Sequence, residues 1–430
     1  MKKGFPLAPQ EKLVERAYLV GVSLPDVAMA TARDQLDELK QLALTAGAVV
    51  VGSTIQGRTR IDGSTYIGQG KVQAVKAECE RLAANLLIFD SDLTPAQARN
   101  VEKILGINVV DRTELILDIF ARHAKTQQAK TQVELAQLIY TLPRLRKLWD
   151  HLSRQQGGIG TRGPGETQLE VDRRRVRDRI SRLKRELKSF DTRSEVVRGS
   201  RNGFPIVALV GYTNTGKSTL MNALTGANTR AENQLFATLD TLTRRMETQS
   251  TTPALLIDTV GFIRKLPHHL VESFKATLGD IAHADLCLHV IDASHPGHAE
   301  QMKVADATLH DIQGRDRNKL YVFNKIDAIE GETVEGLRMR YPDAVFISAE
   351  RRDGLDELKR RIDQALFGRN VEVEVRIRAV DGKRIATVKS LLQKPKSSMR
   401  NGFCILKGRI DSKHMDSLDR LDGIKVRYLL

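Results

Sequence analysis

The sequence predicts an α/β protein in three parts. An α/β part carries a long antiparallel helical hairpin, a central α/β domain surrounds a phosphate-binding loop, and a small α+β domain follows. Short apolar runs typical of buried strands alternate with helical stretches along most of the 430 residues. A G-x-x-x-x-G-K-S loop begins at Gly211 between a strand and a helix. Two apolar stripes at helical spacing flank a glycine-rich segment at residues 151–165.

The composition indicates a soluble globular protein, with 41% hydrophobic and 28% charged residues. No apolar run approaches the roughly 18–20 residues of a spanning helix, and the start from Met1 to Pro6 lacks the apolar stretch of a secretory signal. Three distant cysteines favour a reducing cytoplasm over disulfides or zinc. The formal charge of +15 favours a polyanionic partner, nucleic acid first and an anionic membrane surface second.

Residues 1–120 predict strands that alternate with helices. The helical stretch Pro95–Leu105 lies between two buried runs that each end in Asp, which predicts a βαβ unit. The polar, glycine-rich segment Gly52–Gly70 predicts a loop before a helix that begins near Lys71. An RNA contact and an irregular turn both explain that loop. The predicted strands are Tyr18–Val22, Ala48–Val51, Leu86–Asp90 and Ile107–Asp111.

Residues 121–190 predict the hairpin. One apolar stripe runs from Leu135 to Trp149 and a second from Leu169 to Phe190. From residue 144 to 201 there are 17 Lys and Arg against 8 Asp and Glu, an excess of +9. A solvated coiled coil explains such a charge run, but glycines allow close approach to a phosphate chain and Arg pairs with phosphate. The candidate RNA-contact residues at the tip are Gly157, Gly158, Gly160, Arg162, Gly163 and Gly165.

Three segments complete the predicted organisation. Residues 191–203 are polar and predict a linker. Residues 204–368 alternate strands and helices as in an open α/β sheet. Residues 371–430 predict the small α+β domain, with strands near Val371–Ile377, Gly402–Leu406 and Ile424–Tyr428.

The phosphate-binding loop follows the buried run Ile206–Val210 and precedes a helical run from Leu220. Backbone N–H groups of such a loop and the helix N-terminus surround a β-phosphate. In this motif the Lys bridges β- and γ-phosphate oxygens and the Ser hydroxyl ligates Mg²⁺. The predicted phosphate-binding residues are Gly211, Tyr212, Thr213, Asn214, Thr215, Gly216, Lys217, Ser218 and Thr219, together with Gly261.

Two further motifs select a guanine nucleotide. Asp258 and Gly261 form D-x-x-G after a strand, where Asp258 holds the Mg²⁺ shell through water and the Gly261 N–H meets the γ-phosphate. An N-K-x-D motif ends at Asp327, whose carboxylate accepts from two N–H donors that guanine has and adenine lacks. These motifs in this order predict a P-loop GTPase domain. The predicted guanine-binding residues are Asn324, Lys325, Asp327, Ser348 and Ala349.

The switch segments carry the remaining chemistry. Thr238 is the preferred Mg²⁺-sensing threonine and Thr241 the alternative. Phe262 stands where Ras-like hydrolases have a water-orienting Gln, so slow intrinsic hydrolysis is predicted, with a partner, another switch residue or a cation completing the site. Asn214 is the candidate K⁺ ligand, because cation-stimulated GTPases carry Asn at this position. Switch I is Phe236, Ala237, Thr238, Leu239 and Asp240, and switch II is Asp258, Thr259, Val260, Gly261 and Phe262.

These motifs together resemble the bacterial HflX family of ribosome-associated GTPases, in the Obg–HflX branch of translation-factor GTPases. The resemblance extends from about Glu15 to Phe367 and is weakest over the C-terminal segment. Thr241 departs from the family pattern, which has Pro there, and this leaves the course of switch I open. The distinctive residues are Gly157–Glu170, Asp172–Arg174, Gly211–Ser218, Phe236–Asp240 and Asp258–Phe262.

The resemblance implies a GTP-hydrolysing translation factor. We expect it to be Mg²⁺-dependent, cytoplasmic and, as the default for such switches, monomeric. It implies binding to the large ribosomal subunit and its ribosomal RNA, splitting or rescue of stalled or idle ribosomes, and hydrolysis stimulated by the ribosome. One alternative is a helicase-like RNA-remodelling protein with a second nucleotide site near Asp90 and Asp111, although no second GK[ST] loop is visible. Another is a regulator of a membrane protease, with a peripheral membrane-associated fraction.

Overall fold

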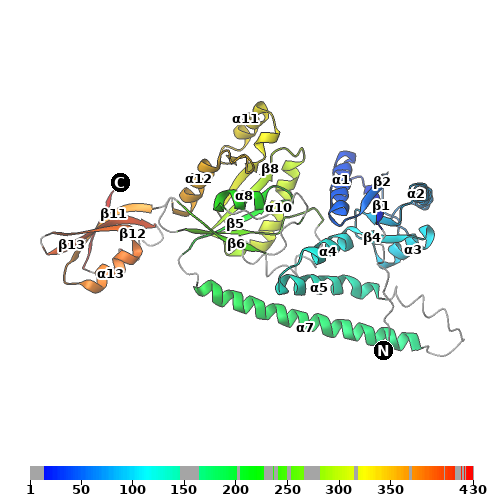
Figure 1. The fold of residues 1–430 in the computed structure, drawn as a ribbon, viewed down its shortest axis with the longest axis horizontal. Coiled ribbons are helices and arrows are strands. Elements are labelled where there is room, and N and C mark those ends of the chain that lie inside the picture. The colour runs from blue at the N-terminus through cyan, green and yellow to red at the C-terminus, as the bar shows by residue number, and fades with distance from the viewer. Residues whose placement is uncertain are drawn as a thin grey trace, which may run out of the picture. The chain divides into compact units, whose positions relative to one another are not determined.

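The computed structural model (Figure 1) divides by its contacts into two units, which are described separately below. The first comprises residues 1–197 with 231–240 and 260–278, and the second residues 198–230, 241–259 and 279–430. The structure describes residues 14–145, 164–200, 204–226, 236, 241–248, 253–265, 281–313, 318–367, 370–400, 402–411, 418, 421 and 423–429.

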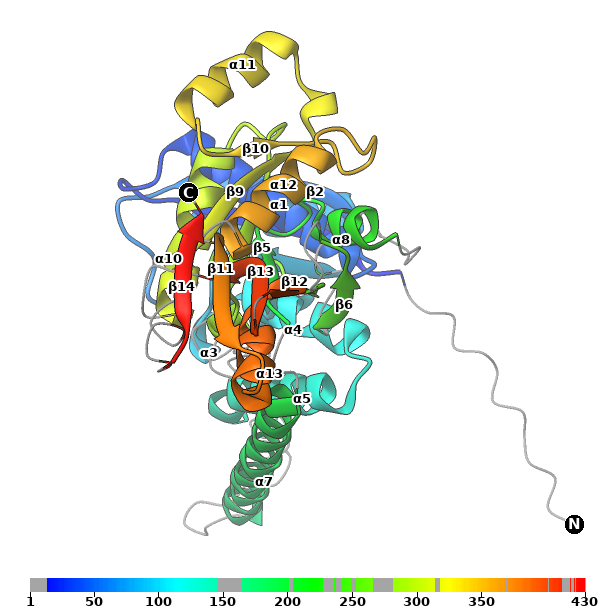
Figure 2. The same cartoon turned by 90° about the vertical axis from the view of Figure 1, so that its left-hand side faces the viewer.

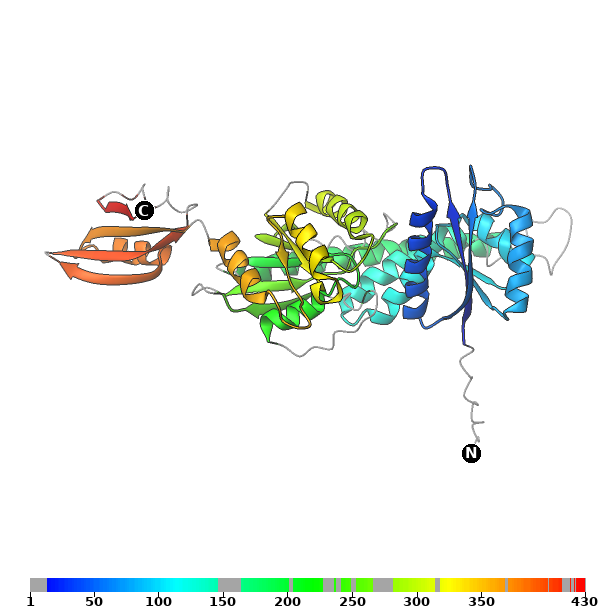
Figure 3. The same ribbon diagram turned by 90° about the horizontal axis from the view of Figure 1, so that it is seen from above.

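The first unit contains a four-stranded parallel sheet in the order β2-β1-β3-β4. Helices lie on both faces of this sheet (Figure 3), and Leu87 and Phe89 of the central strand β3 are fully buried. The predicted βαβ unit is confirmed as β3-α3-β4. The elements are β1 (Arg16–Ser23), α1 (Met29–Thr45), β2 (Val49–Gly57), α2 (Gln69–Arg81), β3 (Leu86–Phe89), α3 (Pro95–Leu105), β4 (Asn108–Asp111) and α4 (Arg112–His123).

The predicted Gly52–Gly70 loop is wrong over its first six residues, because β2 continues to Gly57 and pairs with β1 through Ser23. Glycine is required at position 52, since a Cβ there would lie 2.6 Å from the Tyr18 ring on the neighbouring strand. Gly52 therefore makes room for the Tyr18 ring inside a paired strand and does not mark a turn.

The helical hairpin is formed by α5 (Gln127–Thr141) and α7 (Pro164–Ser200), which lie alongside each other in Figure 1, and α7 extends beyond α5 in Figure 2. Leu135 packs with Leu183 and Leu187, and Arg179 binds both carboxylate oxygens of Glu134 at 2.7 and 2.8 Å. The helix predicted to carry the apolar stripe ends at Thr141, because Pro143 lies in a short 3₁₀ turn, η1 (Leu142–Arg144). The end of the stripe at Leu148 and Trp149 lies outside the described residues.

The segment predicted as a linker is helical over residues 191–200, which continue α7. No glycine or proline interrupts the chain between Gly165 and Gly199, so nothing local ends the helix earlier. None of the helices in the part of the chain that the structure describes is long and apolar enough to cross a membrane.

The second unit contains a six-stranded sheet in the order β10-β9-β8-β5-β7-β6, parallel except for the edge strand β6. The carboxyl ends of β5, β7 and β9 carry the three nucleotide motifs. The elements are β5 (Ile206–Gly211), α8 (Lys217–Thr225), β6 (Leu242–Met246), β7 (Ala254–Asp258), β8 (Leu286–Asp292), α10 (His298–Gln313), β9 (Lys319–Asn324), η2 (Ile326–Ala328), α11 (Gly331–Arg340), β10 (Val345–Phe346) and α12 (Leu355–Phe367).

The C-terminal segment forms a separate antiparallel sheet in the order β12-β13-β11-β14. Val373, Val375 and Leu406 form its core with Val388 of α13. This confirms the predicted small α+β domain. The elements are β11 (Asn370–Arg378), α13 (Gly382–Leu391), β12 (Gln393–Arg400), β13 (Phe403–Asp411) and β14 (Lys425–Leu429).

Candidate nucleotide site

The phosphate-binding loop joins β5 to α8 and depends on two glycines. A Cβ on Gly211 (φ +147°) would lie 2.2 Å from the Val290 carbonyl oxygen. A Cβ on Gly216 (φ +87°) would lie 2.4 Å from the side-chain nitrogen of Asn324. No side chain caps α8 at Gly216. The first backbone N–H groups of the helix are thus suited to an anion, as the sequence predicts.

Lys217 is buried at the start of α8. Its Nζ donates to the carbonyl oxygens of Gly211 at 3.2 Å and Tyr212 at 2.7 Å. Burial lowers the pKa of Lys217 to about 8, which still leaves most of the side chain cationic at neutral pH. The loop therefore holds a positive charge where the motif needs one to meet phosphate oxygens.

The residues present fit a hard divalent cation beside the phosphates. The Ser218 hydroxyl donates to Oδ2 of Asp258 at 2.7 Å, so an α8 hydroxyl and a β7 carboxylate converge. Oxygen donors of this kind suit Mg²⁺. The neighbouring Thr259 hydroxyl donates to the Leu209 carbonyl at 2.7 Å, which fixes the end of β7 against β5.

Asn324 connects three motifs instead of simply facing the base. Its side-chain nitrogen donates to the Thr215 carbonyl at 2.8 Å, and its side-chain oxygen accepts from the Ala349 N–H at 2.9 Å. Lys325 extends the connection, because its Nζ donates to the Asn214 carbonyl at 2.8 Å and to Asp292 at 2.7 Å. The base motif thereby holds the phosphate loop in place.

Asp327 follows in η2, and its side chain is 19% exposed. Its Oδ2 lies 3.8 Å from Nε of Arg351, a distance that leaves the carboxylate able to accept from a base. Ser348 is buried, and its backbone pairs with Asp353 in both directions at 3.1 Å. The structure thus brings Asp327 and the Ser348–Ala349 turn to the same end of β9 and β10.

Switch I lies partly outside the described residues, and the hairpin-tip residues 157–163 also lie outside them. In switch I the residues concerned are Ala237, Thr238, Leu239 and Asp240, so the choice between Thr238 and Thr241 stays a prediction. Phe236 is buried and meets Phe120 of α4 edge to face, with ring centroids 4.7 Å apart. Phe262 is also buried. Both switch phenyl groups therefore have packing roles that the motifs alone did not indicate.

A buried ion network next to the switch II segment was missed at the sequence level. Arg112 of α4 is 2% exposed, and its Nη1 donates to Asp90 at 2.7 Å while its Nη2 binds Glu38. Asp90 also accepts from Lys265 Nζ at 2.6 Å, and Lys265 lies four residues after Gly261. The sequence placed Asp90 at a strand end but offered no signal for its partners, which are 22 and 175 positions away.

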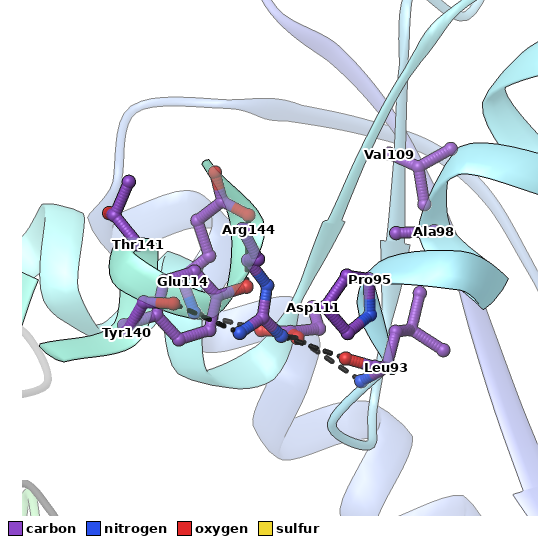
Figure 4. Close-up of a pocket in the computed structure, with 9 residues that line it drawn as sticks. All are labelled: Leu93, Pro95, Ala98, Val109, Asp111, Glu114, Tyr140, Thr141 and Arg144. Atoms are coloured by element: carbon purple, nitrogen blue, oxygen red, sulfur yellow. Dashed lines mark hydrogen bonds and ion pairs between the residues drawn. The ribbon is translucent and has the colours of Figure 1, made fainter. Parts of the chain in front are cut away.

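A cavity of about 180 Å³ lies between α4, η1 and the carboxyl end of β4. In Figure 4, Arg144 reaches from η1 toward Asp111 and the Leu93 carbonyl, at 3.1 and 2.7 Å. Asp111 caps α4 by accepting from the Glu114 N–H at 3.0 Å. Burial raises the pKa of Asp111, and this rise is partly offset by hydrogen bonds from the Glu114 and Leu93 N–H groups and by the charge of Arg144. Asp111 is thus a helix cap and ion-pair partner.

Three family models match the chain. They are a GTP-binding GTPase N-terminal region at residues 33–121, a GTP-binding GTPase middle region at 123–201, and a 50S ribosome-binding GTPase at 206–325. Together with the phosphate loop and the base motif, they define a P-loop GTPase, an enzyme that binds and hydrolyses GTP.

The curated relatives narrow this class to one family. GTPase HflX of Lacrimispora saccharolytica is 48% identical over 367 residues, covering 85% of this chain and 86% of the relative. GTPase HflX of Escherichia coli (strain K12) is 40% identical over 354 residues, covering 81% and 83%. The chain belongs to the HflX family of GTPases, as its motifs predicted.

A solved structure is also similar. A GTP-binding protein from the archaeon Sulfolobus solfataricus, in complex with GDP, is 26% identical, with 82% of this chain and 99% of that chain covered. The TM-score is 0.43. The family assignment therefore rests on the sequences.

Proposed function

We propose that this GTPase binds the large ribosomal subunit through ribosomal RNA and promotes the splitting or rescue of stalled or idle ribosomes, with hydrolysis stimulated by the ribosome. The observation that carries the proposal is a basic helix in the same chain as the GTP site. Charge of this density on one exposed helix favours a polyanion. The exposed basic side chains of α7 are Arg174, Arg175, Arg177, Arg182, Lys184, Arg185 and Lys188.

In the proposed nucleotide cycle, Lys217 neutralises β- and γ-phosphate oxygens and Asp327 reads the guanine edge. Ser218 and Asp258 would hold Mg²⁺, Asp258 through water, and the ion would supply charge neutralisation when bound. Thr238 and the Gly261 N–H would report the γ-phosphate. We propose domain boundaries at residues 120, 190, 203 and 368. Residues 191–200, between two of these boundaries, are helical.

A direct link from the switch segments to the N-terminal sheet supports coupling between nucleotide and partner. Phe236 packs on Phe120, and Lys265 binds Asp90. Phe120 and Arg112 both belong to α4, so one helix packs directly on Phe236 of switch I and reaches Lys265, three residues after switch II, through Asp90. A ribosomal contact that moved α4 would therefore act on both switch segments.

The alternative of a second nucleotide site receives no support from the described residues. Asp90 and Asp111, the strand ends that suggested a cleft, are occupied by Arg112, Lys265 and Arg144. The cavity beside Asp111 is smaller than the roughly 300–1,000 Å³ of ligand pockets. A larger cavity of about 300 Å³ has four acidic residues in its lining against the single cation Arg122, an excess of negative charge that would repel phosphate.

Potassium is expected to accelerate hydrolysis through Asn214. The residue has a left-handed backbone (φ +60°), so Asn also suits this position conformationally. We expect at least about tenfold faster turnover in KCl than in NaCl at equal ionic strength, below the 10³–10⁵ of an arginine finger. Asn214→Gly keeps the backbone conformation, removes the amide and should abolish the difference. Equal turnover of the wild type in both salts would rule out the cation.

The hairpin tip is expected to couple the ribosome to the GTPase without touching the nucleotide. Because α7 begins at Pro164, residues 157–163 can be replaced by a Gly/Ser linker while the helix is kept. Ribosome splitting, followed by light scattering, should fall most, and subunit cosedimentation with a non-hydrolysable GTP analogue should fall less. Arg162→Ala should cost about 1–3 kcal/mol of binding if it makes a specific contact.

Basal GTP binding and hydrolysis without ribosomes are the controls for the tip, and both should remain at wild-type values. A tip-replaced protein that splits ribosomes as fast as the wild type would show that the hairpin is only a solvated coiled coil. A wild-type protein that does not cosediment with large subunits in either nucleotide state would overturn the ribosomal function itself.

A further inference from the structure

The C-terminal sheet has one buried and one open face. Val373, Val375 and Leu406 point into the core with α13, which lies on one side of the sheet (Figure 1). Side chains alternate along a strand, so the residues between them lie on the other face. Glu372, Arg376 and others in that set are exposed, and the open face is therefore accessible.

The strand register gathers cations on this open face. Arg376 lies opposite Lys425 on β14, Glu374 lies between Arg427 and Lys407, and directly opposed residues share a face. On β12, Lys396 lies opposite Lys407, and Arg400 lies opposite Phe403. The exposed basic side chains of this face are Arg376, Arg378, Lys396, Arg400, Lys407, Arg409, Lys425 and Arg427.

Acidic residues balance only part of this charge. Among the described side chains of the open face, Glu374 binds Lys407 at 2.7 Å and Glu372 binds Arg409 at 3.3 Å. Residues 371–430 as a whole carry 14 Lys and Arg against 7 Asp and Glu. The net charge of this segment and the +9 of residues 144–201 together account for the formal +15 of the chain, so the remaining residues are close to neutral in net charge.

An aromatic ring lies among these cations. The Arg376 guanidinium lies over the Phe403 ring, 4.1 Å from its centroid. Arg376 is also exposed, so this residue is accessible to a ligand. Nucleic-acid bases stack on aromatic rings and on guanidinium planes, and flanking cations track the phosphate chain. Only a polyanion that carries flat apolar groups uses both features.

We propose that the open face of β11 to β14 is a binding surface for unpaired RNA. A base stacks on the Arg376–Phe403 pair, while the strand-edge cations Lys425 and Arg427 contact phosphates. RNA is favoured over a membrane, because the described side chains of this face place cations around a half-buried ring and form no broad apolar surface that would enter a bilayer. This surface is separate from the hairpin and does not depend on ribosome splitting.

The test uses the full chain with Arg174, Arg177 and Arg185 changed to Gln, which reduces RNA binding by the hairpin. Fluorescence anisotropy measures binding of a short oligouridine over a salt series. Lys425→Gln with Arg427→Gln should weaken binding at least about tenfold and lower the salt slope by roughly 0.7 per lost phosphate contact. The matched control, Lys383→Gln with Lys389→Gln on α13, removes the same charge and should change affinity less than about twofold.

The stacking contact is tested separately. Phe403→Leu should weaken oligouridine binding by about 5- to 100-fold, and Phe403→Tyr should retain it. If the open-face and α13 double variants lost the same amount of oligouridine affinity, net charge alone would explain the binding and the proposal would be wrong. So would unchanged affinity in Phe403→Leu. If the open-face variants lose binding to phosphatidylserine vesicles but keep oligouridine affinity, the surface recognises membrane and the RNA proposal is wrong.

Discussion

Asp327→Asn is expected to lower GTP affinity by about 2–5 kcal/mol, the cost of leaving a charged hydrogen-bond pair unmet in a closed site. The wild-type carboxylate only accepts, which matches the two donors of the guanine edge, whereas the new amide places a donor against a donor. Xanthosine triphosphate should recover part of the affinity, because its edge offers an acceptor. Displacement of a fluorescent guanine nucleotide from the full chain measures both ligands and ATP.

Asp343→Asn is the matched control for Asp327→Asn. Asp343 is exposed in the turn before β10 and should leave all three affinities unchanged when neutralised. Loss of the Arg351 side chain is a second control. Nε of Arg351 lies 3.8 Å from Asp327, so this change removes a partner of Asp327 but keeps its carboxylate as the acceptor for the base. If ATP displaced the guanine nucleotide from the wild type as readily as GTP does, the base-reading role of Asp327 would be refuted.

Asp90→Asn should destabilise the N-terminal sheet by about 3 kcal/mol, near the lower end of the cost of breaking a buried ion pair, because Glu38 still binds Arg112. Arg112 is 2% exposed and cannot exchange its lost partner for water. Since a chain with several domains need not unfold in one step, amide hydrogen exchange in α4 is the better measurement. Exchange there should accelerate by about two orders of magnitude.

Lys265→Gln removes the contact next to switch II while the buried pair between Asp90 and Arg112 remains. Its side chain is 38% exposed, so its loss should cost below about 1 kcal/mol. Both variants remove the ion pair between Asp90 and Lys265, although Asp90→Asn keeps the Lys265 hydrogen bond to the Asp90 backbone carbonyl at 3.1 Å. A change in GTP hydrolysis common to both variants reports that ion pair. Glu78→Gln, which breaks the exposed pair with Arg81, is the control for charge alone. Slow α4 exchange in Asp90→Asn would mean that the network does not hold the helix.

The nucleotide site was predictable because its motifs are local. The loop from Gly211 to Ser218 and the pair Asn324–Asp327 each occupy a few consecutive residues at the end of a buried strand. A parallel sheet brings such ends to one edge, so the order of motifs was enough to predict their meeting. The sequence did not show that Asn324 braces the loop through Thr215, since that bond joins residues 109 positions apart.

Two segments, Gly52–Gly57 and residues 191–200, have a different secondary structure from the one that their local residue types predicted. Gly52 suggested a turn by its residue type, but the Tyr18 ring on the paired strand is what requires a glycine there. The polar run at 191–200 suggested a linker, yet polarity does not end a helix that no Gly or Pro interrupts. In the first place strand pairing, and in the second continued helical hydrogen bonding, decides the backbone conformation, and local composition does not.

The sequence by itself determined the GTPase fold, the guanine preference and the family of this protein, because catalytic loops use short patterns with fixed backbone requirements. Only the tertiary structure decided which residues support and extend that site. Asp90 meets Lys265 across 175 positions, and Arg376 meets Phe403 through strand register. Such pairs depend on how strands and helices pack, and no spacing rule in one sequence encodes contacts made between distant segments.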